Sequence, residues 1–144
     1  MKVLVVNGAN LDLLGRRDPV QYGDLSLAKI ENFLKEQFPE DDFYFFQSNV
    51  EGDIVGRLHE ALEESFDGLI INPGGYAHTS VVIHDALELL KIPKIEVHLS
   101  NLASRESFRQ VLITAAACDG YISGLKEKSY IAAAFTLHFL KTRR

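Results

Sequence analysis

Short apolar runs alternate with longer amphipathic segments along the whole chain. Five of these runs have the length of strands: KVLVV (2–6), DFYFFQ (42–47), GLIIN (68–72), KIEVHL (94–99) and GYISG (120–124). The runs are too uniformly apolar for a sheet with one solvated face. Uniform apolarity is typical of parallel strands that helices cover on both sides. The pattern therefore predicts a buried parallel sheet.

The segments between these runs carry the period of surface helices. Residues 26–38, 53–66 and 79–91 each place their apolar side chains on one helical face, and residues 129–141 close the chain as a further helix. Strands that alternate with helices favour a doubly wound α/β fold. We predict a flavodoxin-like three-layer sandwich with a five-stranded parallel sheet in the order 2-1-3-4-5, formed by residues 1–144 as a single catalytic domain.

Composition and charge narrow the class of protein. The chain has 144 residues, 47% of them hydrophobic, which is enough for one globular core. No apolar run reaches the ~18–20 residues of a membrane span, and a net charge of −5 argues against a general nucleic-acid partner. The single cysteine, Cys118, allows no internal disulfide and agrees with a reducing compartment. We therefore expect a cytoplasmic protein that binds neither membranes nor nucleic acid.

Polar residues follow the predicted strands at the point where each strand ends. They are Asn7–Asn10, Gln47–Asn49, Asn72–Gly75 and His98–Asn101. Because ligands of such sheets bind beyond the carboxyl ends of the strands, these groups converge where a site is expected. Amides, hydroxyls and an imidazole suit a small molecule that carries hydroxyl groups or a carboxylate. Asn and Gly also form ordinary turns, so each cluster taken alone has a structural alternative.

The common signatures of cofactor and nucleophile sites are missing. The chain contains neither G-x-G-x-x-G nor G-x-x-x-x-G-K-[ST], and it lacks the nucleophile elbow G-x-S-x-G. The lysines lie outside the four polar clusters, which disfavours Schiff-base chemistry. Acid–base chemistry that uses no cofactor remains.

The spacing of Glu96 and His98 indicates a catalytic pair without reference to any other motif. They are two residues apart on a predicted strand, so their side chains leave the same face. The carboxylate can hold the imidazole in one tautomer and stabilise its protonated form. His98 is therefore a candidate acid at the strand tip. A buried histidine that only satisfies a hydrogen bond in the core is the alternative.

Four motifs in a fixed order carry a resemblance to a known family. NGANLDLLGRRDPVQYG, NPGGYAHTS, EVHLSN and SRESFR resemble the signatures of the type II 3-dehydroquinate dehydratases, and the resemblance extends to GYISGLKEKSY. The chain departs from the usual pattern at Ala9 (usually Pro), Asp12 (usually Asn) and Ala103 (usually His). The resemblance implies dehydration of 3-dehydroquinate to 3-dehydroshikimate through an enolate, in the shikimate pathway that leads to chorismate and the aromatic amino acids.

The loop LGRRDPVQYG, residues 14–23, matches the family segment that carries the catalytic base. A tyrosine with a reference pKa of ~10 is a poor base at neutral pH, but a nearby guanidinium favours the phenolate. Tyr22 is the predicted base and Arg17 its activator, on a loop that closes over the substrate and excludes water. The alternative is a solvated basic turn with an exposed tyrosine.

The resemblance also implies roles for the other polar groups. His98, held by Glu96, protonates the departing hydroxyl, and Asn10 positions a water against the enolate oxygen. The residues that hold the substrate are Asn72, Gly74, Gly75, His78, Leu99, Ser100 and Arg109. Taken singly, each has an ordinary alternative as a turn residue, a helix cap or a solvated side chain.

Asp85 follows the third predicted strand, on a helix where a solvent-facing carboxylate is the ordinary interpretation. The resemblance implies instead that Asp85 reaches the site of a neighbouring subunit in a trimer, and that such trimers assemble into a homododecamer. The apolar segment YIAAAFTLHFL, residues 130–140, fits either a core or an interface.

Two other classes of protein stay open. A metal-dependent hydrolase would use His78, Asp85, Glu96 and His98, although the chain lacks a compact ligand motif such as H-E-x-x-H. A non-catalytic flavodoxin-like module would bind flavin or a nucleotide. Sensitivity to a chelator distinguishes the first class, and the absorbance of the purified protein distinguishes the second.

Overall fold

A parallel sheet forms the centre of the computed structural model, which describes residues 1–22 and 25–142 and, of Tyr22, the backbone. Within these residues the sheet has five strands in the order β2-β1-β3-β4-β5. The strands are β1 (Lys2–Asn7), β2 (Asp42–Gln47), β3 (Gly68–Asn72), β4 (Lys94–His98) and β5 (Gly120–Ser123). The fold class and the strand order predicted from the apolar runs are confirmed.

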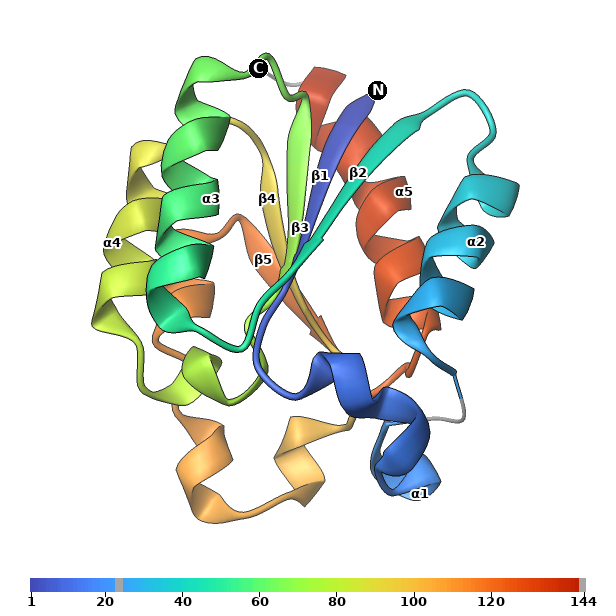
Figure 1. Cartoon of the computed structure of the whole chain (residues 1–144), viewed down its shortest axis with the longest axis vertical. Helices are drawn as coiled ribbons and strands as arrows, with labels where there is room; N and C mark the ends of the chain where they lie inside the picture. The colour runs from blue at the N-terminus through green and yellow to red at the C-terminus, as the bar shows by residue number, and fades with distance from the viewer. Residues whose placement is uncertain (23–24, 143–144) are drawn as a thin grey trace.

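Helices cover both faces of the sheet (Figure 1). One face carries α2 (Leu27–Gln37) and α5 (Lys128–Thr142), and the other carries α3 (Glu51–Glu63) and α4 (Val81–Leu89). A one-turn helix, α1 (Pro19–Tyr22), lies at the end of the molecule to which the strands point. Within the described residues, no helix has both the length and the apolar character that a membrane crossing requires.

Successive side chains of β1 enter two separate cores. Val3 and Val5 belong to the core under α2 and α5, whereas Leu4 and Val6 belong to the core under α3 and α4. All four side chains are at most 1% exposed. Because neighbouring side chains of a strand leave opposite faces, a central strand with two covered faces has to be apolar throughout.

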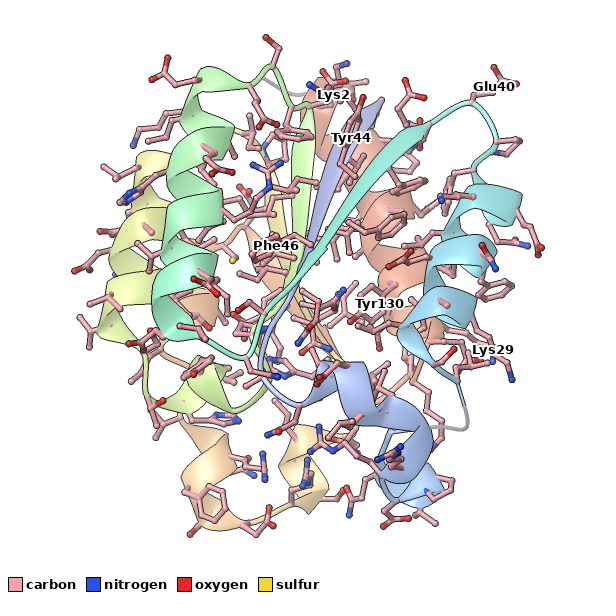
Figure 2. All side chains as sticks on the ribbon, in the orientation of Figure 1. Lys2, Lys29, Glu40, Tyr44, Phe46 and Tyr130 are labelled. Atoms are coloured by element: carbon pink, nitrogen blue, oxygen red, sulfur yellow. The ribbon has the colours of Figure 1, made fainter. Side chains whose placement is uncertain are left out.

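The expectation that every strand is buried is wrong at the two edges of the sheet. Tyr44 in β2 is 46% exposed, and Tyr121 in β5 is 55% exposed. An edge strand has a neighbour on one side only, so the helices cover it less completely. The Lys2 ammonium lies 5.1 Å from the centre of the Tyr44 ring and covers part of this edge (Figure 2).

The loops after β1 and β3 approach each other so closely that they require glycine. A Cβ atom on Gly8 would lie 2.2 Å from the carbonyl oxygen of Pro73. Gly74 adopts a φ of 63°, which is the left-handed region, and a Cβ atom there would lie 2.9 Å from the carbonyl oxygen of Ala9. These close contacts fix the crevice where the strand order reverses, which is the usual ligand site in such sheets.

A buried hydrogen-bond network ties α5 to the same strand ends. Tyr130 projects from α5 toward the sheet (Figure 2), where its hydroxyl donates to Asn7 Oδ1 at 2.5 Å and accepts from Asn72 Nδ2 at 2.9 Å. Burial raises the pKa of Tyr130 well above its ordinary value, so the hydroxyl stays protonated and keeps its donor role. The network holds the Asn72 amide in one orientation at the base of the crevice.

Candidate active site

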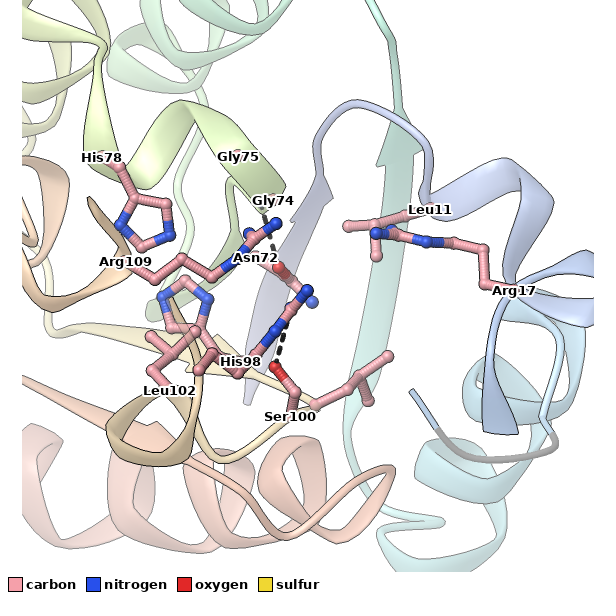
Figure 3. Close-up of a pocket in the computed structure, with 12 residues that line it drawn as sticks. Leu11, Arg17, Asn72, Gly74, Gly75, His78, His98, Ser100, Leu102 and Arg109 are labelled. Atoms are coloured by element: carbon pink, nitrogen blue, oxygen red, sulfur yellow. Dashed lines mark hydrogen bonds between the residues drawn. The ribbon is translucent and has the colours of Figure 1, made fainter. Parts of the chain in front are cut away.

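A pocket lies at the carboxyl edge of the sheet (Figure 3). Its lining residues come from the ends of β3 and β4 and from the loops that follow β1, β3 and β4. Most of the residues that the sequence predicted for a site lie in this pocket. Within the described part of the chain they are Arg17, Asn72, Gly74, Gly75, His78, His98, Leu99, Ser100 and Arg109.

His98 stands at the end of β4 and is held from below by Glu96. The Nε2 atom of His98 lies 2.6 Å from Glu96 Oε1, and the Thr114 hydroxyl donates to Glu96 Oε2 at 2.6 Å. Glu96 and Thr114 are fully buried. A carboxylate whose two oxygens each accept a hydrogen bond keeps one orientation. Because a carboxylate only accepts, Nε2 of His98 donates to Glu96, and Nδ1 is the ring nitrogen that faces a ligand.

Thr114 was missed by the sequence reasoning. It lies in the apolar run VLITAAAC, 18 positions after Glu96, on a separate 3-10 segment (Thr114–Ala117). The signal available in the sequence was a hydroxyl group within an apolar run. Such a hydroxyl is expected to be buried, and a buried polar group requires a hydrogen-bond partner.

His78 faces His98 across the pocket. The two rings are stacked with their centres 6.2 Å apart, and His78 Nδ1 lies 2.7 Å from the carbonyl oxygen of Val111. A carbonyl only accepts, so Nδ1 carries the proton and Nε2 has a free lone pair. Burial lowers the pKa of His78 below its ordinary value of 6.5, and the bond to Val111 opposes this shift only in part. The ring is therefore neutral at pH 7, and its Nε2 atom can accept a hydrogen bond from a hydroxyl group.

We expect an NMR titration of His78 to have a midpoint below 6.5, with the Nδ1–H tautomer above it. Because the unfolded chain binds this proton at higher pH, protonation of His78 lowers the free energy of unfolding as pH falls through 6.5. The same resonance in urea-unfolded protein is the reference. A midpoint above that of the unfolded chain, or an Nε2–H tautomer, would contradict this assignment.

Arginines give the pocket a positive lining in a chain with a net charge of −5. Arg17, Arg105 and Arg109 line it, whereas none of its described lining residues is Asp or Glu. Arg105 Nη1 donates to Ser100 Oγ at 3.2 Å (Figure 3). Arg109 Nε donates to Glu106 at 2.7 Å. Guanidinium groups stay charged when water is excluded, so the pocket suits an anion.

Arg105 was also missed as a site residue, although it belongs to the quoted motif SRESFR. Its side chain is 9% exposed and lies against Ser100, one of the predicted substrate contacts. The signal was present in the motif, but the spacing of Arg105 and Arg109 does not tell that both of them line the pocket.

Two predicted residues are placed elsewhere. Asn10 is exposed and does not line the pocket, and its backbone N–H donates to Asn49 Oδ1 at 2.9 Å. Asp85 lies on α4 with 65% of its side chain exposed and contacts His84 at 3.0 Å. The phenolic side chain of Tyr22 and the predicted hinge residue Gly23 lie outside the described part of the chain.

The ligand set of the alternative hydrolase is not assembled. His78 and His98 line the pocket, but Asp85 lines a different hollow together with Glu88 and Lys91. Lys126 follows β5 at the carboxyl edge of the sheet, although no lysine among the described residues lines the pocket itself.

The fold and the pocket together define a flavodoxin-like α/β enzyme with a cationic small-molecule site. A family model described as dehydroquinase class II matches residues 1–138. The chain therefore belongs to the class II dehydroquinase family, as its four ordered motifs predicted.

Individual relatives agree with this membership. A 3-dehydroquinate dehydratase from Caldicellulosiruptor saccharolyticus is 49% identical over 138 residues, which cover 94% of this chain and 95% of that protein. The crystal structure of a type II dehydroquinase from Butyrivibrio crossotus has a TM-score of 0.92 at 41% identity and covers 96% of this chain and 97% of its own. The crystal structure of a type II dehydroquinase from Propionibacterium acnes has a TM-score of 0.88 at 36% identity and covers 98% of this chain and 96% of its own.

Proposed function

We propose that residues 1–144 form a single catalytic domain that dehydrates 3-dehydroquinate to 3-dehydroshikimate, with Tyr22 as base and His98 as acid. The observation that carries this proposal is the His98 ring, held 2.6 Å from a fully buried Glu96 inside a pocket lined by arginines. Membership of the class II dehydroquinase family supports the substrate and its place in the shikimate pathway.

The first step is removal of a proton from carbon 2 of the substrate, next to the ketone. The Tyr22 phenolate takes this proton, and the electron pair moves onto the ketone oxygen to form an enolate. Arg17, which lines the pocket five positions before Tyr22, stabilises the phenolate through its charge. Asn10 holds a water that donates a hydrogen bond to the enolate oxygen.

The second step is loss of the hydroxyl on carbon 1. The enolate re-forms the ketone, a carbon–carbon double bond forms, and the C1–O bond breaks as imidazolium His98 gives the Nδ1 proton to the leaving oxygen. The bond from Nε2 to Glu96 holds the ring in place, so that Nδ1 faces the leaving oxygen. Water leaves, and the proton taken by Tyr22 returns to His98 through solvent.

The substrate is held by groups at the carboxyl edge of the sheet. The backbone of Leu99 and Ser100 binds the carboxylate, with the Arg105 guanidinium 3.2 Å from Ser100 Oγ to supply positive charge. His78 Nε2 and Arg109 bind ring hydroxyls. Asn72 also binds a ring hydroxyl. Its bonds to Tyr130 and Gly74 use one amide hydrogen and one oxygen lone pair, so a second hydrogen and a second lone pair remain for the substrate. Gly74 and Gly75 let the substrate approach the backbone.

The direct test is to add 3-dehydroquinate to purified protein and follow the ultraviolet absorbance of the conjugated enone. We expect turnover without added cofactor and with full activity after exhaustive chelation, since side chains, backbone and water fill every proposed role. Absence of the enone product would overturn the proposal. Activity lost to a chelator and restored by a divalent cation would favour the hydrolase class instead.

Replacement of Thr114 by Val is expected to lower kcat about 10-fold with little change in KM. Valine keeps the shape of threonine but leaves Glu96 Oε2 without its 2.6 Å donor, so the carboxylate is less well oriented under His98. The unpaired buried oxygen also lowers the free energy of unfolding by about 1–3 kcal/mol. Thr114→Ser keeps the hydroxyl and is the control. Equal kcat for the Val and Ser variants would contradict the role.

We further propose that the protein acts in the cytoplasm as a homo-oligomer of trimers, in total a dodecamer, with Asp85 reaching a neighbouring site. Asp85 is exposed on α4, next to the exposed apolar side chains of Val81, Val82 and Leu89. We expect a native mass that is a multiple of three chains, and reduced activity of Asp85→Asn in an intact assembly. A fully active monomer, measured by light scattering with an activity assay, would contradict both.

A further inference from the structure

Lys126, in the loop between β5 and α5, combines an unusual backbone conformation with a long-range contact. Its φ is 51°, in the left-handed region that residues with a side chain rarely adopt. Its ammonium donates to the carbonyl oxygens of Val20 at 2.7 Å and Pro19 at 3.1 Å, which lie 106 and 107 positions away. The loop therefore keeps a costly conformation in which the lysine reaches α1.

The α1 segment depends on such outside contacts. A helix of one turn is unstable by itself, because nucleation fixes several residues for few hydrogen bonds. Val20 is 80% exposed, so it contributes little apolar packing. At the start of the turn, the Asp18 side chain accepts a hydrogen bond from the Val20 N–H at 2.9 Å. The Lys126 ammonium donates to two carbonyl oxygens of this short helix, the kind of contact that cations make at helix carboxyl ends.

The same lysine is also fixed to the wall of the pocket. Its backbone N–H donates to the carbonyl oxygen of Leu99 at 2.9 Å, and Leu99 lines the pocket directly after His98. Arg17, two positions before Pro19, lines the pocket from the other side (Figure 3). Lys126 is thus a short connection between the segment that carries Arg17 and the strand end that carries the acid.

We propose that Lys126 is a positioning residue that clamps the segment Arg17–Tyr22 to the pocket wall and so sets the place of Arg17 relative to His98. Its catalytic consequence rests on the proposed function, whereas its structural consequence does not. The ammonium, and not the backbone of the loop, is the part of Lys126 that performs this task.

The test compares Lys126→Met with Lys126→Gly. Both variants lose the ammonium, but glycine also adopts a positive φ without strain, so the Gly variant should have the higher Tm. We expect an arginine-specific protease to cut after Arg16 and Arg17 about 10-fold faster in both variants than in the wild type, the factor that follows from loss of a charge-assisted hydrogen bond. We expect kcat for 3-dehydroquinate to fall by a similar factor in both.

Two further variants complete the design. Lys126→Arg keeps a cationic donor and should restore both the slow cleavage and most of the turnover. Lys128→Met removes a nearby ammonium that contacts the Glu127 side chain and should leave both unchanged. Fragments that end at Arg16 and Arg17 are identified by mass spectrometry.

The two proposals fail in distinguishable ways. Wild-type cleavage rates in the Met and Gly variants would overturn the clamp, and so would cleavage rates that follow Tm instead of the loss of the ammonium. Faster cleavage of the Met and Gly variants would support the clamp even if the wild-type protein does not convert 3-dehydroquinate. That second result would overturn the proposed function alone.

Discussion

Replacing His98 with Ala is expected to lower turnover by about 10³-fold, within the range that proton transfer by a positioned side chain contributes. Proton exchange at carbon 2 should persist, because a different group removes that proton. His98 Nε2 is bound to Glu96 at 2.6 Å, so the ring presents its other nitrogen to the pocket, where the proposed mechanism requires it to protonate the leaving hydroxyl. The measurements are kcat from the enone absorbance and deuterium uptake by recovered substrate.

The control for this variant addresses Glu96, which is fully buried and keeps Thr114 but loses its other hydrogen-bond partner when His98 becomes Ala. A buried carboxylate with one oxygen left unpaired destabilises the fold, so a loss of activity could come from unfolding. His98→Asn keeps a donor near Glu96 and cannot act as an acid at neutral pH, so it should be as inactive as Ala but more stable to urea. Loss of the exchange together with turnover would assign the base role to His98 instead.

Replacing Tyr22 with Phe is expected to lower turnover by roughly 10²-fold or more, while KM changes little. The substitution removes only the phenolic oxygen and keeps the aromatic ring, so substrate binding loses no apolar contact. Arg17→Lys should also lose much of the turnover, because an ammonium lacks the planar guanidinium that stabilises the phenolate from the pocket wall. In Arg17→Lys the rising limb of the pH–rate profile should move to higher pH, since the base then ionises less readily.

A surface tyrosine supplies the matched control. Tyr121 is 55% exposed on the edge strand β5, and Tyr121→Phe should leave both kcat and KM unchanged. If Tyr22→Phe has near-normal turnover, or if its defect appears only in KM, Tyr22 is not the base. The base would then have to be His78 or His98, the imidazoles that line the pocket.

The clusters of polar residues at the strand ends were predictable because they depend on local sequence. Once the strands are parallel, their carboxyl ends meet at one edge, so Asn72, His78, His98 and Ser100 converge without further information. The strand ends do not determine the position of a side chain that a loop or helix carries away from that edge. Asp85 follows the third strand but lies on the outer part of α4, where sequence alone does not tell which subunit it serves.

The apolar runs and the helical periods by themselves determined the sheet, its parallel order and the layers of helices, because each is a repeated pattern among neighbouring residues. Only the tertiary structure decided which groups support the site. The Thr114 hydroxyl on Glu96 spans 18 positions, Tyr130 reaches Asn7 over 123, and Lys126 reaches Val20 over 106. Such contacts leave no periodic trace in the sequence, since each depends on one pair of side chains that meet only after the layers have packed.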